Sequence, residues 1–185
     1  MSDVTTSYRF TARLLHWAIG LLIIAMILAG FAMLQEELPR SVRNTLFIFH
    51  KNAGILALVA VIVRLAYRAL HTPPALPETV EPMQRRAAAV SHFALYALMI
   101  AMPIFGYVRV KAGGFPIESL DAWGVPSLVP RSDQLASLAK SAHYVGAIVI
   151  SVVVLAHISA ALYHALVLKD GVFQRMWFSA SKAEK

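Results

Sequence analysis

The sequence contains no cysteine and few charged residues. Without cysteine, the 185-residue chain can form no disulfide, no iron–sulfur cluster, no thiolate nucleophile and no covalent c-type haem attachment. Charged residues make up 15% of the chain, whereas a typical soluble domain has about a quarter. Apolar residues make up 58%, which is more apolar surface than a water-soluble domain of this size can cover. The composition therefore predicts a protein of the lipid bilayer.

Four apolar stretches are long enough to cross a membrane, which takes about twenty helical residues. They cover residues 14–34, 46–67, 87–110 and 142–168. Each must be helical, because lipid offers the backbone no hydrogen-bond partners. We therefore predict an all-α fold, a four-helix transmembrane bundle that forms a single domain over residues 1–185. The first stretch has no small-residue cleavage site, so we expect a retained span and not a signal peptide.

The connections between these stretches differ in character. Residues 35–44 form a short connection, and residues 71–82 contain prolines that rule out a continuous helix. Residues 111–140 form a long connection, and loops of this length usually have a function or a structure of their own. We expect this loop to cap one end of the bundle, with a short helix over residues 132–138.

The net charge of +7 is best explained by membrane topology and anionic lipid, and we expect no nucleic-acid binding. The spans divide the lysines and arginines between two sides. One side has ten: Arg9, Arg13, Arg64, Arg68, Arg85, Arg86, Lys169, Arg175, Lys182 and Lys185. The other has seven: Arg40, Arg43, Lys51, Arg109, Lys111, Arg131 and Lys140. Because cytoplasmic loops are richer in these residues, we predict a multi-pass membrane protein with both termini in the cytoplasm.

Four histidines near the ends of the predicted spans are the main candidates for a functional site: His16, His50, His143 and His157. Ionisable groups at membrane depth are costly and usually functional. Because successive spans alternate in direction, His16 and His157 come near the inner face, and His50 and His143 near the outer face. Fourteen residues separate His143 from His157. This is nearly four helical turns, so both lie on one helix face, about 21 Å apart in depth.

Two imidazoles from facing helices at equal depth are the ligands of a six-coordinate b-type haem. We therefore predict two haem b groups per chain, one held by His16 and His157 and the other by His50 and His143. Small residues one turn from each histidine leave room for a flat macrocycle: Gly20, Gly54, Gly146 and Ala161. Basic residues are predicted to bind the propionates: Arg13, Arg64 and Arg68 on the inner side, and Lys51 and Lys140 on the outer side.

Packing, zinc binding and proton relay each account less well for these four histidines. A single intramembrane histidine is often a hydrogen-bonded packing residue, but two depth-matched pairs are hard to reach by packing alone. No cysteine or acidic residue joins them, which disfavours a zinc site or a proton relay. His92 and His164 are expected to have a structural or propionate-binding role, although His164 is the main rival of His157 as a ligand.

Four segments of the sequence resemble the bacterial cytochrome b561 family of small di-haem, quinone-linked membrane cytochromes. These segments are RLLHW, FHKNAGILALVAVIVRLAYR followed by TPPALP, SHFALYALMIAMPIFGY, and LAHISAALYHALVLKDGVFQRM. The resemblance covers nearly the whole chain and implies the same haem ligands, His16, His50, His143 and His157. Many relatives have two adjacent histidines where this chain has Tyr163 and His164. Since the first of the two is not a ligand, this departure is not expected to disturb the haems.

Two functions of different classes agree with the sequence, and the resemblance implies the first. One member type is a superoxide oxidase, which takes electrons from superoxide at the periplasmic face and reduces ubiquinone. The alternative is an anchor subunit that carries electrons between a separate dehydrogenase or hydrogenase and the quinone pool. The long loop resembles a self-contained cap, which favours the free-standing oxidoreductase.

Charge gives a physical reason to expect superoxide as the donor. A basic entrance at the outer pair would attract a small anion and speed its association. The candidate residues are Lys51, Arg109, Lys111, Arg131 and Lys140, opposed by Glu118, Asp121 and Asp133 in the long loop. Lipid headgroups or haem propionates are equally good partners for these basic residues.

Overall fold

The computed structural model describes residues 7–178, and every regular element within that range is helical. The four long helices are α1 (Phe10–Ala32), α2 (Arg40–Leu70), α3 (Pro82–Ala112) and α5 (Asp133–Tyr163). One π-helical turn, η1 (His164–Leu168), continues α5, and a short helix, α4 (Glu118–Ala122), lies between α3 and α5 in the chain. Four helical segments are long and apolar enough to cross a membrane, which confirms the predicted all-α transmembrane bundle.

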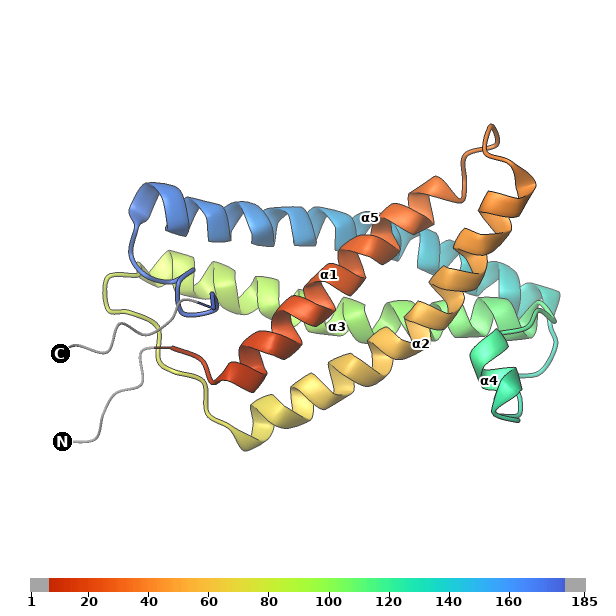
Figure 1. Cartoon of the computed structure of the whole chain (residues 1–185), viewed down its shortest axis with the longest axis horizontal. Coiled ribbons are helices and arrows are strands. Elements are labelled where there is room, and N and C mark those ends of the chain that lie inside the picture. The colour runs from red at the N-terminus through yellow and green to blue at the C-terminus, as the bar shows by residue number, and fades with distance from the viewer. Residues whose placement is uncertain (1–6, 179–185) are drawn as a thin grey trace.

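The long helices form two neighbouring pairs (Figure 1). Helix α1 packs on α2, helix α3 packs on α5, and the contact between α2 and α3 joins the pairs. At mid-height, α1 and α2 contribute a buried cluster of Ile19, Ile23, Ala57 and Val61. Side chains of α3 and α5, among them Met99 and Val154, pack against it. This apolar cluster fixes the crossing of the four helices.

Local sequence signals set the helix boundaries. Helix α2 begins directly after Pro39, and α3 begins with Pro82 at its first position, where the missing amide hydrogen costs nothing. Glu81 and Gln84 form a capping box at the start of α3. The Ser132 side chain accepts a hydrogen bond from the Leu135 amide at 3.2 Å and so caps α5.

The predicted short helix over residues 132–138 is wrong as a separate element. Residues 133–138 form the first turns of α5, which runs without interruption from its Ser132 cap because no helix breaker follows. The short helix of the loop is α4, which lies earlier in the chain. The positive φ of 78° at Gly114 lets the chain turn sharply after α3 and leads it toward α4.

The two ends of the bundle are covered by different segments. At one end, here called the cap end, α4 lies near α2. At the other end, residues 169–178 run against α1; we call these residues the strap and this end the strap end. The cytoplasmic position of the strap end stays a prediction. Two of the cations used for it, Lys182 and Lys185, lie outside the described residues.

Polar contacts hold the cap on α2. Lys51 Nζ donates a hydrogen bond to the Pro116 carbonyl at 2.7 Å and forms an ion pair with Glu118 at 2.6 Å. The Asn52 amide donates to Glu118 at 2.8 Å, and its oxygen accepts from the Ser119 backbone at 2.8 Å. Burial raises the pKa of Glu118, but the hydrogen bonds from Lys51, its own backbone and Asn52 hold it below the usual value.

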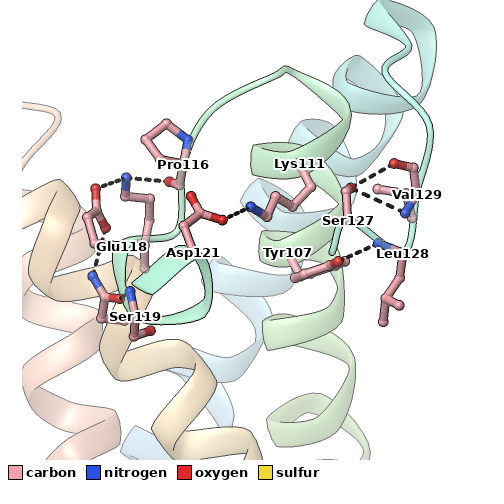
Figure 2. A network of polar contacts seen from close by, with 11 residues as sticks. Tyr107, Lys111, Pro116, Glu118, Ser119, Asp121, Ser127, Leu128 and Val129 are labelled. Atoms are coloured by element: carbon pink, nitrogen blue, oxygen red, sulfur yellow. Dashed lines mark hydrogen bonds and ion pairs between the residues drawn. The ribbon is translucent and has the colours of Figure 1, made fainter. Parts of the chain in front are cut away.

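Further contacts tie the cap loop to α3 (Figure 2). Lys111 forms an ion pair with Asp121 of α4, and the Tyr107 hydroxyl accepts a hydrogen bond from the Leu128 amide at 2.8 Å. Ile117, just before α4, is 2% exposed and anchors the loop in an apolar contact. The cap is therefore an ordered part of the bundle end.

Candidate functional site: two histidine pairs

His50 of α2 and His143 of α5 face each other near the cap end. Their ring centres are 6.0 Å apart, and the ring planes are inclined by 79°. Helices α2 and α5 do not pack on each other along their length, because α2 packs on α1 and α3, whereas α5 packs on α3. The helix crossing thus brings together the pair that was predicted from depth.

Each ring of this pair lies against a glycine of a neighbouring helix. A Cβ atom on Gly30 of α1 would come within 3.3 Å of His50 Cε1, and one on Gly106 of α3 within 3.3 Å of His143 Cε1. The absent side chains therefore allow the rings to lie close to the helix backbones. Neither glycine was predicted from the sequence, because the predicted small residues lie one turn along each histidine's own helix.

The ring nitrogens of this pair show which atoms are free. His143 Nδ1 lies 3.1 Å from the Met102 carbonyl and donates a hydrogen bond to it, which leaves Nε2 as the free nitrogen. Both ring nitrogens of His50 are buried. The Met26 backbone lies near the ring, but neither ring nitrogen makes a hydrogen bond of ordinary geometry. Unpaired buried polar groups are rare and need a partner. Here the missing partner has the chemistry of a metal or a hydrogen-bonding ligand.

A cavity of about 1340 Å³ adjoins this pair. It is larger than the range of about 300–1,000 Å³ found for small-molecule sites. Its lining includes both histidines and both glycines, together with the cations Lys51, Arg109 and Lys140. The cavity is therefore mostly apolar, with basic side chains toward the cap end.

His16 of α1 and His157 of α5 face each other near the strap end. Their ring centres are 6.1 Å apart, with the planes inclined by 75°. His92 of α3 is a third member, with its ring centre 5.5 Å from that of His157. A structural or propionate-binding role was predicted for His92 from the sequence, but its contact with His157 was not.

Arg64 of α2 lies beside the strap-end pair. Its guanidinium donates hydrogen bonds to the Ala12 carbonyl at 2.9 Å and to the Tyr96 hydroxyl at 3.1 Å. A third nitrogen, Nη2, lies 3.4 Å from His16 Nδ1. These contacts fix a positive charge next to His16.

His164, the predicted rival of His157, lies away from the pair. Its Nδ1 donates a hydrogen bond to Asp170 at 2.6 Å, and its ring contacts Tyr163. His71 stacks on Tyr67 with the ring centres 4.1 Å apart. Within residues 7–178, neither His71 nor His164 makes a ring contact with another histidine. Four histidines therefore form the two pairs, and His92 adjoins one of them.

Comparison with known proteins identifies the family. The family model of prokaryotic cytochrome b561 matches residues 7–179. The chain belongs to the prokaryotic cytochrome b561 family. It is 33% identical to the probable superoxide oxidase CybB of Yersinia pestis over 171 residues, which cover 88% of this chain and 90% of the relative. It is 29% identical to cytochrome b561 homolog 2 of Escherichia coli strain K12, over 87% of this chain and 86% of the relative.

Membership of the cytochrome b561 family makes the chain a multi-pass electron-transfer protein of the bacterial inner membrane and implies haem b. The histidine pairs fit that group. Ring-centre separations of 6.0 Å and 6.1 Å would leave room for one metal ion between the two imidazoles of each pair. No cluster of three or more His, Cys, Asp or Glu side chains suited to a metal ion occurs within residues 7–178. Each pair supplies two imidazole donors, and a macrocycle-bound metal needs only two protein ligands.

The predicted propionate contacts have the following surroundings. Arg64 lies beside His16, and with Arg68 it lines a pocket of about 280 Å³ at the strap end. Arg13 donates to the Trp177 carbonyl at 2.8 Å and lies over the Phe178 ring, so its observed partners belong to the strap. At the cap end, Lys51 is engaged by Glu118, whereas Lys140 lines the large cavity. A propionate role for each of these residues stays a prediction.

The predicted small residues also differ in their surroundings. A Cβ atom on Gly20 would meet nothing within 4 Å, which leaves open space one turn from His16. One on Gly54 would make an ordinary contact of 3.5 Å with Met26. One on Gly146 would clash with the Met102 sulfur, so this glycine lets α3 and α5 pack closely. Of these three glycines, Gly20 best fits the predicted cradle.

Arg109 of α3 is a candidate that the predicted propionate set did not include. It is half-buried, lines the large cavity, and is close enough for its charge to act on both His50 and His143. Lys51 and Lys111 form ion pairs with Glu118 and Asp121. Among the described residues, Arg109 and Lys140 have no carboxylate partner. The sequence analysis named Arg109 only among the basic residues expected near the outer pair, at the end of the predicted span 87–110.

Proposed function

We propose that the protein is a di-haem oxidoreductase that passes electrons from superoxide to ubiquinone. The observation that carries the proposal is the presence of two histidine pairs, near opposite ends of a transmembrane bundle, each of which could hold one haem iron between its two rings. The relationship to a probable superoxide oxidase, at 33% identity, supports the choice of donor.

In this proposal His50 and His143 hold one haem b, and His16 and His157 hold the other. A bound haem b accepts and releases a single electron at its iron. The Met102 carbonyl fixes the tautomer of His143 and keeps its Nε2 available as a ligand. Gly30 and Gly106 admit the cap-end imidazoles close to the helix backbones.

The overall reaction balances with two superoxide ions for each quinone. Each superoxide loses one electron and becomes dioxygen. Ubiquinone takes up the two electrons and two protons and becomes ubiquinol. The protein's residues must therefore admit an anion at one end of the bundle and a quinone from the membrane.

The cap end has basic side chains that can attract the superoxide anion. Of the five cations predicted to surround the entrance, Lys51 and Lys111 are neutralised by Glu118 and Asp121. Arg109 and Lys140 line the cavity without a carboxylate partner among the described residues. An unbalanced basic lining attracts small anions and raises their association rate. The proposal therefore places superoxide at the cap end, which the charge distribution of the loops predicts to be periplasmic.

Rapid mixing of the oxidised, purified protein with superoxide tests the proposal, with the haem Soret band as the signal. We expect fast reduction that slows with added salt, followed by reoxidation on addition of ubiquinone. The double change Arg109→Gln and Lys140→Gln should lower the rate about tenfold or more and weaken the salt dependence. Arg86→Gln, an exposed change at the strap end, is the matched control and should have little effect.

Haems that stay oxidised in superoxide would refute the superoxide reaction. The alternative function, an anchor subunit for a separate dehydrogenase or hydrogenase, would then be tested by gentle purification from the native membrane. A stoichiometric partner that reduces the haems from its own substrate would establish that function. Absence of haem from the protein would refute both.

A further inference from the structure

The chain reverses its direction directly after η1. Lys169 adopts a left-handed conformation with a φ of 52°, and Gly171 has a φ of 83°. Asp170 lies between them and accepts hydrogen bonds from His164 at 2.6 Å and from the Val172 amide at 3.1 Å. The reversal directs the strap back toward the start of α1.

Three hydrogen bonds join the strap to the first two turns of α1 and the residues before it. The Tyr8 amide donates to the Arg175 carbonyl at 3.2 Å. Arg13 donates to the Trp177 carbonyl, and the Trp17 indole donates to the Met176 carbonyl, both at 2.8 Å. The strap therefore presents successive carbonyl groups to α1.

Aromatic contacts surround these hydrogen bonds. The Trp17 ring centre lies 5.2 Å from that of Trp177 and 6.4 Å from that of Phe173, and the two strap rings stack on each other at 5.4 Å. Phe10 and Phe178 make a further edge contact at 5.9 Å. Such pairs add to the stabilisation from burial, because the edge of one ring is attracted to the face of the next.

Trp17 is also in contact with the strap-end histidine pair. Its ring centre lies 5.6 Å from that of His16, the next residue before it. His16 belongs to α1 and His157 to α5, yet these helices make little direct contact, since α1 packs on α2 and α5 on α3. The strap begins directly after η1, which continues α5, and it ends against α1, so it connects the two helices whose histidines must meet.

We infer that the strap positions His16 opposite His157. Trp17 is the positioning residue, because it contacts both the strap and His16. The inference rests on the proposed haem ligation. Loosening the strap leaves the cap-end pair intact, because His50 and His143 lie at the other end of the bundle. The strap thus acts on one haem site and not on the other.

Two variants of Trp17 test this inference. Trp17→Phe keeps an aromatic ring but removes the indole donor to Met176, and Trp17→Leu also removes the ring contacts. The matched control is Trp123→Leu at the cap end, because Trp123 is 75% exposed and makes none of the strap contacts. Redox titration and electron paramagnetic resonance of the purified proteins then report on the two haems separately. The strap-end haem is identified by its loss in His157→Ala.

We expect the potential and the resonance signal of the strap-end haem to change in Trp17→Phe and to change further in Trp17→Leu. The cap-end haem should keep its wild-type values in both, and Trp123→Leu should leave both haems unchanged. A second readout needs no electron transfer: trypsin should cut after Arg175 about three- to tenfold faster in Trp17→Phe, as expected for the loss of one hydrogen bond.

Three results would overturn the inference: an unchanged strap-end haem in both Trp17 variants, an equal shift of both haems, or trypsin cleavage at the wild-type rate. Wild-type protein without haem would instead refute the proposed function, and in that case the cleavage assay still tests whether Trp17 holds the strap. Trp17→Phe retains the ring, so its result does not depend on whether Trp17→Leu folds.

Discussion

The two histidine pairs have nearly equal ring separations, 6.0 Å and 6.1 Å, but different surroundings. At the cap end, each ring lies against a glycine, and the pair opens onto a large cavity. At the strap end, a third histidine and Arg64 adjoin the pair, and a segment outside the long helices lies against its α1 side. The same separation is thus reached at one end through close helix approach and at the other through an added segment.

This difference predicts that the two sites fail in different ways. The cap-end site depends on the absence of side chains at Gly30 and Gly106, so it should be sensitive to added volume. The strap-end site depends on contacts made after α5 ends, so it should be sensitive to lost contacts. Substitutions that change one histidine pair and not the other can test this difference.

Removal of a ligand should have the largest effect. His143→Ala is expected to lower the haem content from two per chain to one, because the remaining His50 cannot complete a six-coordinate site. The content is measured by the pyridine haemochrome method against protein concentration. His71→Ala is the matched control, since His71 stacks on Tyr67 and is in neither pair, and it should keep both haems.

Substitution of the third histidine should have an intermediate effect. His92→Phe is expected to keep two haems per chain, because His16 and His157 supply both ligands of the strap-end site. The potential of that haem should change, since a polar ring 5.5 Å from His157 is replaced by an apolar one. Haem content and redox titration check this. Loss of one haem would instead make His92 a ligand and would overturn the assignment of His16.

Added volume at Gly106 should have a smaller and local effect. Gly106→Ala would place a Cβ 3.3 Å from His143 Cε1, so the ring must move by a few tenths of an ångström. We expect a changed resonance signal for the cap-end haem and none for the strap-end haem. Gly20→Ala provides the comparison, because its Cβ meets no atom of the protein within 4 Å, and it should leave the cap-end haem unchanged.

Acid should have the smallest effect, confined to the cap. The pKa of Glu118 lies below its usual value of 4.5, so its ion pair stabilises the cap fully above that value. The contribution is lost as the pH falls through the lowered pKa, because the neutral acid no longer attracts Lys51. The protection of the α4 amides against hydrogen exchange, measured relative to the intrinsic exchange rate at each pH, should therefore fall in acid. Glu118→Gln should have the lower protection already at neutral pH and lose this acid dependence; Lys111 and Asp121 remain paired in that variant.

Much of the fold follows from sequence because lipid restricts the possible structures. The four spans and their caps have strong local signals, such as Pro82 after Glu81 and the Ser132 cap. Helix direction then gives the depth of each histidine, which was enough to predict which rings meet. The predicted separate helix near Ser132 was wrong, because no local signal distinguishes a short helix from the first turns of a long one.

Contacts between helices could not be read from the sequence. Gly30 and Gly106 lie on helices that carry neither member of the pair they accommodate, so spacing along one helix does not reveal them. His92 reaches His157 only through the packing of α3 on α5. The strap could not be predicted from the sequence either, because its contacts join residues about 160 positions apart, such as Trp17 and Met176.

The most direct test of the account is the number and ligation of haems in the purified wild-type protein. Pyridine haemochrome analysis gives the ratio of haem b to protein, and electron paramagnetic resonance of the oxidised protein gives the spin state of each haem. The account predicts two haem b groups per chain, both low-spin with two axial imidazoles and distinct in their signals. A single haem per chain, or a high-spin haem with one histidine ligand, would contradict it.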